Sequence, residues 1–169
     1  MNEIHLAQAA KITSPNPISL VCTRRTDGGT NLAPVSWWTY LSYKPGMIGF
    51  AMSQKSYSGQ CVQASKSVVL TVPGEALAQK AMQCGGVSGS TTDKAAQFGI
   101  DLMPVGGTDI QIPVHTRLAI VCRLKEYHAV GDHNLYLCEV TNVYADETQN
   151  ALFAWGGYAA LGPASPHNP

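Results

Sequence analysis

The chain has 169 residues, and its eleven basic and eleven acidic side chains give a formal net charge of zero. Charged residues make up only 13% of the sequence, which argues against the broad basic face of a nucleic-acid-binding protein. No apolar run is long enough to predict a membrane span. The length suits a single domain, residues 1–169, that buries a core of its own.

The first fifteen residues, "MNEIHLAQAAKITSP", lack the basic start and continuous apolar core of a secretory signal. We therefore expect a cytoplasmic protein. Hydrophobic residues make up 45% of the chain, so much weakly charged surface is left over. This composition favours a homodimer over a monomer.

Short apolar runs between turn residues predict strands in the first half of the chain. Residues 18–22 form one such run before a charged, Gly-rich bend at 24–29. "GMIGFAMS" (46–53) and "KSVVLTVPG" (66–74) follow, the latter stopped by Pro73 and Gly74. Between these two runs, "YSGQCVQASK" (57–66) predicts one or two helical turns, capped by the hydroxyl of Ser58.

The clearest helix is predicted for "EALAQKAMQCGG" (75–86), which is Ala-rich and ends at a Gly pair. Leu77 and Ala81 share one side of it. The polar loop "SGSTTDK" (88–94) then leads into a second short helix.

Residues 118–124 alternate between apolar and more polar side chains and predict a strand, followed by a hairpin that turns at Gly131-Asp132. "ALFAWGGYAALG" (151–162) supplies a last strand with a bend at its Gly pair. About six short strands with two or three brief helices favour a closed or nearly closed antiparallel barrel over a parallel α/β sheet.

The five cysteines are odd in number, widely spaced and without a Cys-x-x-Cys pair, which predicts free buried thiols. A hairpin register with Leu124 opposite Cys138 and Cys122 opposite Val140 keeps the apolar residues on one face. The two thiols are then diagonal neighbours, at roughly the upper limit of disulfide reach. The cysteines are Cys22, Cys61, Cys84, Cys122 and Cys138.

A Ser-rich loop with one lysine turns into the predicted helix at 57–66. Its residues Ser53, Lys55, Ser56 and Ser58 offer hydroxyls and an ammonium beside free helix N–H groups, which is what a phosphate monoester needs. A plain Ser-rich turn with an ordinary cap explains the same residues.

The loop at 88–94 also precedes a helix start, and Lys94 would place a second cation near the same anion. The alternative is a solvated loop that uses Asp93 as a helix cap. On a strand, adjacent Trp37 and Trp38 point to opposite faces, so one suits the core and the other a partner chain or a planar ligand.

No Gly-x-Gly-x-x-Gly fingerprint follows a strand, and no P-loop or Gly-x-Ser-x-Gly elbow is present in the sequence. His128 and His133 flank the hairpin turn without carboxylates or thiols at metal-site spacing. We expect no metal centre.

Five segments, in this order, resemble the flavin reductase-like family of FMN-binding split barrels, which includes flavoredoxin. They are "NLAPVSWWTYLSYKPG", "KSYSGQCVQASKSVVLTVPG", "SGSTTDK", "GDHNLYLCEV" and "GGYAALG". The likeness extends from about residue 17 to residue 162. It implies a mainly β fold, namely a six-stranded split antiparallel barrel with Greek-key connections and a few short helices. It also implies a homodimer that binds FMN near the subunit interface.

Matched position by position, the resemblance implies three flavin-contacting groups. The strand and loop along the isoalloxazine carry Asn31, Ala33, Pro34, Ser36, Thr39 and Ser42. The phosphate segment carries Lys55, Ser56, Tyr57 and Ser58, and the loop on the other side of the flavin carries Ser88, Gly89, Asp93 and Lys94. Ser58 stands where the family usually has Thr, Ala95 where Phe often follows the lysine, and Cys138 where Gly is usual.

Gly131, Asp132 and His133 match the family's Gly-Asp-His, which implies that His133 lies near the flavin or an incoming nicotinamide. The resemblance implies an NAD(P)H-dependent flavin reductase that transfers hydride from NADH or NADPH to FMN and feeds a monooxygenase or another acceptor. We assign His133 as the catalytic-site residue and favour orientation of the nicotinamide over acid–base chemistry. The alternatives are an FMN-binding electron carrier with little NAD(P)H oxidase activity, and a barrel that has lost flavin.

Overall fold

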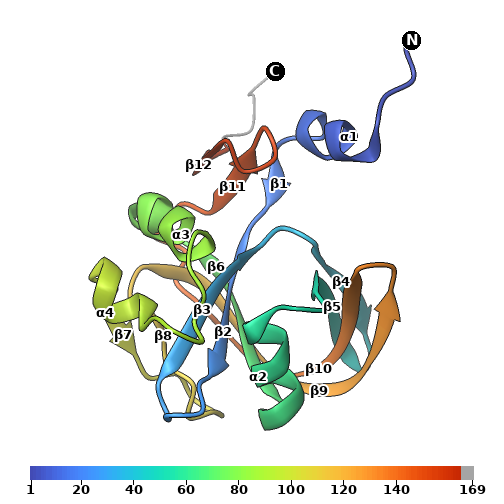
Figure 1. The fold of residues 1–169 in the computed structure, drawn as a ribbon. Coiled ribbons are helices and arrows are strands. Elements are labelled where there is room, and N and C mark those ends of the chain that lie inside the picture. The colour runs from blue at the N-terminus through green and yellow to red at the C-terminus, as the bar shows by residue number, and fades with distance from the viewer. Residues whose placement is uncertain (165–169) are drawn as a thin grey trace.

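The computed structural model describes residues 1–164 (Figure 1). In chain order its elements are α1 (Leu6–Ile12), β1 (Asn16–Pro17), β2 (Ser19–Arg24), β3 (Thr30–Val35), β4 (Trp38–Tyr43), β5 (Gly46–Ser53), α2 (Tyr57–Ser65), β6 (Ser67–Pro73), the 3-10 turn η1 (Glu75–Leu77), α3 (Ala78–Gly85), α4 (Lys94–Phe98), β7 (Leu102–Met103), β8 (Ile112–Pro113), β9 (Thr116–Val130), β10 (His133–Ala145), β11 (Leu152–Trp155) and β12 (Ala160–Pro163).

The main sheet is antiparallel throughout, with the strand order β3-β2-β6-β9-β10-β5-β4. Its two edge strands, β3 and β4, follow one another in the chain and are separated only by residues 36–37. The sheet therefore curls until its two edges meet at this bend. These strands and the few short helices confirm the predicted mainly β, antiparallel fold.

The connection between β5 and β6 runs through α2, which crosses one end of the barrel (Figure 1). It carries the chain from one side of the sheet to the other, because β6, β9 and β10 are consecutive neighbours and β5 lies beside β10. This is the expected Greek-key arrangement. The start of α2 is thereby brought to the β5–β10 side of the barrel.

The long β9–β10 hairpin has the predicted register, with Cys138 opposite Leu124 and Val140 opposite Cys122. Its turn contains Gly131 at a φ of 59°, a left-handed conformation that glycine adopts without strain. All five cysteines are free and buried, as predicted.

Apolar side chains fill both faces of β2, β6 and β9. Val21, Leu70 and Ile120 point into the barrel together with Phe50 and Tyr136. The neighbouring residues on the same strands point outward, under α3, α4 and residues 100–112; they include Leu20, Cys22, Val69, Ala119 and Val121. This second layer explains why β2 is buried along most of its length.

The predicted helix at 75–86 appears as η1 followed by α3, and Leu77 and Ala81 are both buried as expected. Residues 151–162 form two paired strands, β11 and β12, where one bent strand was predicted. The left-handed Gly156 and Gly157 reverse the chain between them. With β1, these strands make a small sheet beside α1, at the top of Figure 1.

Within residues 1–164, no helix has the length and apolar character needed to cross a membrane.

Candidate functional site

The N-terminus of α2 is open to anions. Ser56 caps the helix, because its hydroxyl accepts a 3.2 Å hydrogen bond from the Gly59 amide. Tyr57 and Ser58 are the first two residues of α2, so the helix itself provides no acceptor for their amides. Lys55 stands next to this end with its side chain exposed. The arrangement has the donors and the positive charge that a phosphate group requires.

The predicted capping role of Ser58 was wrong, because the cap is Ser56, two positions earlier. Ser58 is the second residue of α2, only 4% exposed, and its hydroxyl accepts a 2.7 Å hydrogen bond from the side-chain amide of Asn31. The cap falls to Ser56 because the chain is still extended there, with φ −64° and ψ 125°.

Asn31 lies on β3 and joins this strand to α2. Its amide nitrogen donates to the hydroxyl of Ser58 and, at 3.2 Å, to that of Thr23 on β2. The residue is 1% exposed, and its carbonyl oxygen Oδ1 has no hydrogen-bond partner within the described residues. A buried acceptor of this kind is uncommon and marks the position as one of interest for ligand binding.

The loop at 88–92 packs directly on Asn31. A Cβ built on Gly89 would lie 1.9 Å from Asn31 Oδ1 and 3.2 Å from Tyr57 Cδ1, so only glycine permits this approach. Ser88 and Ser90 remain exposed, with their hydroxyls 2.8 Å apart. The structure thus brings together three predicted segments, at residues 31, 56–58 and 88–89.

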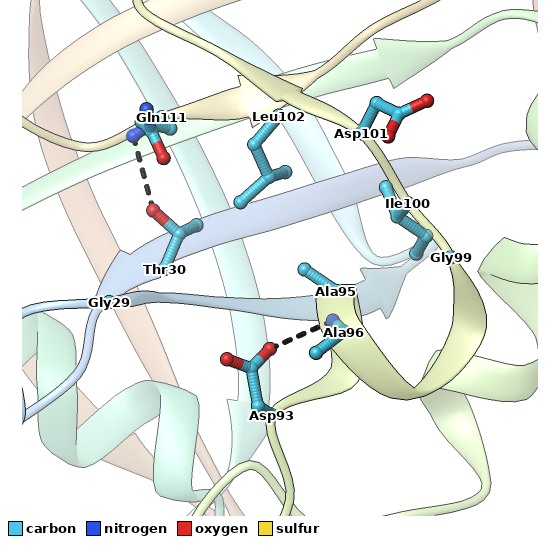
Figure 2. A pocket seen from close by; sticks show the side chains of 10 residues that line it. All are labelled: Gly29, Thr30, Asp93, Ala95, Ala96, Gly99, Ile100, Asp101, Leu102 and Gln111. Carbon is cyan, nitrogen blue, oxygen red and sulfur yellow. Dashed lines mark hydrogen bonds between the residues drawn. The ribbon is translucent and has the colours of Figure 1, made fainter.

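Lys94 is in the core and not at the surface of this site. It is 4% exposed, and its ammonium donates to the backbone carbonyls of Leu32 at 2.8 Å and Cys84 at 2.7 Å. Burial lowers the pKa of this ammonium. The predicted second cation for an anion is therefore turned inward, where it ties α4 to β3 and α3. The side chain of Asp93 caps α4 by accepting a hydrogen bond from the Ala96 amide (Figure 2). This agrees with the alternative prediction that the loop uses Asp93 as a helix cap.

His133 begins β10 directly opposite Ser53, the last residue of β5. Its Nδ1 lies 2.6 Å from the carboxylate of Asp132, and this contact lowers the pKa of Asp132. The ring centroid of Trp37 is 4.9 Å from that of His133. Trp37 is 55% exposed, so His133 and Trp37 form an accessible pair where the loop at residues 54–56 leaves β5.

The remaining predicted residues of β3 divide between two faces. Ala33 packs against the barrel core, on the same side of the strand as Asn31. Pro34 faces α3, since a Cβ on Gly85 would lie 3.1 Å from its Cγ. Pro34 therefore points away from the side of β3 on which the α2 site lies.

Thr39 and Ser42 lie on β4, further from the start of α2. They pair with Gly49 and Met47 of β5, four and six positions before Ser53. At about 3.3 Å per residue, this places them more than about 10 Å along the strand from the loop at residues 54–56.

Three residues that the sequence analysis did not assign to the flavin also lie beside the predicted flavin segments. Trp37 is the exposed member of the tryptophan pair, while Trp38 packs on the barrel core. Tyr158, in the turn between β11 and β12, lies beside Ser36; burial raises the pKa of its phenol, and contact with Ser36 partly offsets this. Arg25, in the β2–β3 turn, binds the backbone of Thr92. The Gly-Gly-Tyr segment was a usable signal for Tyr158, whereas nothing local pointed to Arg25.

A hollow of about 430 Å³ lies next to this site but does not include it (Figure 2). It is lined by Thr30, Ala95 and Leu102 among others, and Asp93 is the one predicted flavin residue in its lining. Thr30 and Asn31 are neighbours on β3, and their side chains alternate. The hollow and the α2 site therefore lie on opposite faces of the strand.

Among residues 1–164 there is no group of three or more His, Cys, Asp or Glu side chains placed to hold a metal ion.

A curled antiparallel sheet with its site at the α2 end defines a split-barrel protein. A family model described as "Flavin reductase like domain" matches residues 12–162. The chain therefore belongs to this family.

Three solved structures share the fold. The FMN-binding protein of Thermus thermophilus with bound p-hydroxybenzaldehyde has a TM-score of 0.81 at 22% identity, covering 94% of this chain and 93% of its own. The flavoredoxin of Desulfovibrio vulgaris (Miyazaki F) has a TM-score of 0.84 at 18% identity, covering 100% and 96%. The NADH:FAD oxidoreductase of Streptomyces globisporus C-1027 has a TM-score of 0.84 at 13% identity, covering 98% and 99%.

Two curated relatives, uncharacterized proteins of Archaeoglobus fulgidus and Pyrococcus abyssi, are 22% and 27% identical over 113 and 112 residues, which are 67% and 65% of this chain. The matched part spans a little under two thirds of their own length, at 64% and 63%.

Proposed function

We propose that the chain binds FMN and acts as an NAD(P)H-dependent flavin reductase. The observation that carries the proposal is the meeting of four segments: the capped start of α2, Asn31 of β3, the loop at Gly89, and the His133–Trp37 pair. The resemblance to the family's motifs had implied that each of these segments lies near a bound flavin. Three solved proteins with this fold are described as an FMN-binding protein, a flavoredoxin and an NADH:FAD oxidoreductase.

The residues at the start of α2 suit the phosphate of FMN. The free amides of Tyr57 and Ser58 would donate to the phosphate oxygens, and the exposed ammonium of Lys55 would balance their charge. The exposed hydroxyls of Ser88 and Ser90 lie on the neighbouring loop. Lys94, the second lysine predicted for this anion, is buried and donates to backbone carbonyls instead.

The segment around Asn31 suits the polar part of the flavin. Its Oδ1 is an acceptor without a partner, and the ring system of a flavin carries an N–H donor between two carbonyls. Gly89 covers that atom, so a ligand N–H would satisfy it once the loop at residues 88–92 moves aside. The narrow approach of Gly89 keeps larger side chains away from it.

Bound FMN would supply the acceptor for hydride from a reduced nicotinamide. In our proposal His133 orients the carboxamide of that nicotinamide, and Trp37 shields the imidazole on one side. Asp132 holds Nδ1 of His133, which leaves Nε2 to face the substrate. The protein's part is positioning, since hydride transfer to a flavin needs no strong general acid.

We further propose that the protein is a homodimer. Four exposed large apolar side chains lie on the edge strand β4 and at the residue before it: Trp37, Tyr40, Leu41 and Tyr43. An apolar row on an unpaired strand edge is a surface that proteins usually cover. Reduced flavin, or electrons from it, would pass to a monooxygenase or another acceptor.

The test is titration of the purified protein with FMN, followed by measurement of NADH and NADPH oxidation at saturating FMN. We expect micromolar or tighter binding, seen as quenching of flavin fluorescence, and turnover well above that of free FMN. Binding without turnover with either nucleotide would identify the electron carrier instead. Absence of binding would overturn the proposal and identify a barrel without flavin.

A further inference from the structure

We propose that Arg25 is a positioning residue that fixes the loop at residues 88–92 against α2 and thereby sets the affinity for flavin. The proposal about affinity rests on the proposed function, whereas the contact itself does not. No motif in the sequence points to this arginine. Its role follows from the way its three guanidinium nitrogens are used.

The β2–β3 turn holds Arg25 rigidly. The Arg25 amide donates to the Gly29 carbonyl at 2.8 Å, and the Gly28 amide donates back to the Arg25 carbonyl at 3.1 Å. Asp27 completes the turn by accepting from the Gly29 amide at 3.1 Å. The backbone from which the guanidinium extends is therefore ordered by its own hydrogen bonds.

Asp27 also orients the guanidinium. Its carboxylate accepts from Nε of Arg25 at 3.0 Å and from Nη2 at 2.7 Å, a two-pronged contact that sets the plane of the group. These hydrogen bonds raise the pKa of Arg25, and its side chain is only 14% exposed. Two nitrogens are occupied in this way, and the third is aimed outward from the turn.

The third nitrogen, Nη1, donates a 2.7 Å hydrogen bond to the carbonyl of Thr92, 67 positions along the chain. Thr92 immediately precedes Asp93, the cap of α4. The other end of the loop is fixed where Gly89 meets Asn31 and Tyr57. Only residues 90 and 91 separate the two anchors, so the placement of Gly89 beside the start of α2 depends on the Arg25 contact.

Arg24 provides a matched control. It precedes Arg25, carries the same charge, and pairs with Asp109 in the segment between β7 and β8. Replacing either arginine with alanine removes one positive charge and one ion pair from neighbouring positions. Only Arg25→Ala removes a contact to the loop.

The first measurement is amide hydrogen exchange of residues 89–92 in flavin-free protein. We expect exchange to be faster by about tenfold or more in Arg25→Ala, the factor that corresponds to loss of one hydrogen bond from a charged group, and unchanged in Arg24→Ala. Arg25→Lys, which keeps one donor but loses the fork, should fall between wild type and Arg25→Ala. Unchanged exchange in Arg25→Ala would overturn the proposal.

The second measurement is FMN affinity in the same variants, with thermal melting to establish that each is folded. Arg25→Ala should bind FMN about tenfold more weakly, Arg25→Lys should recover part of the loss, and Arg24→Ala should stay within about twofold of wild type. A loosened loop with unchanged affinity would overturn the positioning role. Weakened affinity with an undisturbed loop would overturn it too, in favour of direct contact between Arg25 and the ligand. Failure of the wild type to bind FMN would defeat the proposed function, and hydrogen exchange would still decide whether Arg25 holds the loop.

Discussion

Asn31 and Ser58 are 27 positions apart in the chain and share a buried 2.7 Å hydrogen bond that joins the edge strand β3 to the start of α2. Ser58→Ala leaves the Asn31 amide with Thr23 as its remaining acceptor. We expect the free energy of unfolding to fall by about 1–3 kcal/mol, the cost of leaving a buried polar group unsatisfied. Asn31→Ala should cost a similar amount.

Urea unfolding of both single variants and the double variant checks this prediction. The two losses should not add, with a coupling energy of about 0.5 kcal/mol or more, because each substitution removes the same hydrogen bond. Strict additivity would show that the two groups contribute separately.

Gly86 and Gly89 both lie between α3 and α4, and we expect their replacement by alanine to have opposite effects. A Cβ at Gly89 meets Asn31 Oδ1 at 1.9 Å, so Gly89→Ala must displace the loop or the strand, and we expect FMN affinity to fall by about tenfold or more. Gly86 has φ −82°, and a Cβ there meets only the Gln83 carbonyl at 3.5 Å. Gly86→Ala should be neutral or stabilising by up to about 1 kcal/mol. Flavin titration and thermal melting of both variants test this difference. Equal FMN affinity and equal stability of the two variants would contradict the prediction.

Lys55 and Lys94 were both assigned to the flavin, and the structure predicts different consequences for their removal. Lys94→Met leaves the carbonyls of Leu32 and Cys84 without their donor, so we expect a loss of about 1–3 kcal/mol in the free energy of unfolding. Lys55 is exposed, and Lys55→Ala should change stability by less than about 0.5 kcal/mol while weakening FMN binding about tenfold.

Urea unfolding measures the first effect and flavin titration the second. A Lys94→Met protein as stable as wild type would mean that other donors or water satisfy those carbonyls. Unchanged FMN affinity in Lys55→Ala would place the phosphate away from α2.

His133→Ala should retain FMN but slow its reduction by NADH or NADPH about tenfold or more, because the imidazole is proposed to orient the nicotinamide. His128, two residues before the turn, provides the control, since it is exposed and paired with Glu126 at 3.4 Å. Stopped-flow reduction of the bound flavin separates this step from later electron transfer. Equal reduction rates in wild type and His133→Ala would make His133 an ordinary turn residue.

The buried thiols predict loss of stability at alkaline pH. Burial raises the pKa of Cys84 to about 11 and the pKa values of Cys22 and Cys138 to about 12, from 9.0, and it also raises the pKa of Cys122. Above about pH 9 the unfolded chain releases these protons while the folded protein keeps them, so the free energy of unfolding falls as pH rises from 9 toward 11. Each thiol contributes up to about 1.4 kcal/mol per pH unit in this range. Lys94 acts in the opposite direction, since its lowered pKa favours the folded state as pH rises, but it is one group against four.

Urea unfolding at pH 8, 9 and 10 checks this dependence. In Cys138→Ala, the free energy of unfolding should fall less steeply with pH, by roughly the contribution of one thiol. It should still fall, because the other buried cysteines remain. A flat profile between pH 8 and 10 would show that ionised thiols are tolerated in the fold or that water reaches them.

Much of the barrel was predictable because its signals are local. Alternating apolar residues and a Gly-Asp turn predicted the β9–β10 hairpin and its register around Cys138, since a shift of one residue there would turn the apolar side chains to the other face. The register shifts on either side, between Leu137 and Cys138 and between Val140 and Asn142, were not predicted. The same register supported the free state of Cys122 and Cys138. The family's motifs, read in order, indicated the family, and the matched family model confirms it.

The tertiary structure decided which side chain does what within those segments. Ser56, and not Ser58, caps α2 because the backbone is still extended at Ser56, which the letters Ser-Tyr-Ser do not reveal. Lys94 is drawn inward by two carbonyls from distant elements, although a lysine in a polar loop is normally solvated. Arg25 and Thr92 are 67 positions apart and meet only because the barrel brings the β2–β3 turn to the start of α4. Local pattern determines the elements and their faces, while partners distant in sequence determine which polar groups are buried, paired or left free for a ligand.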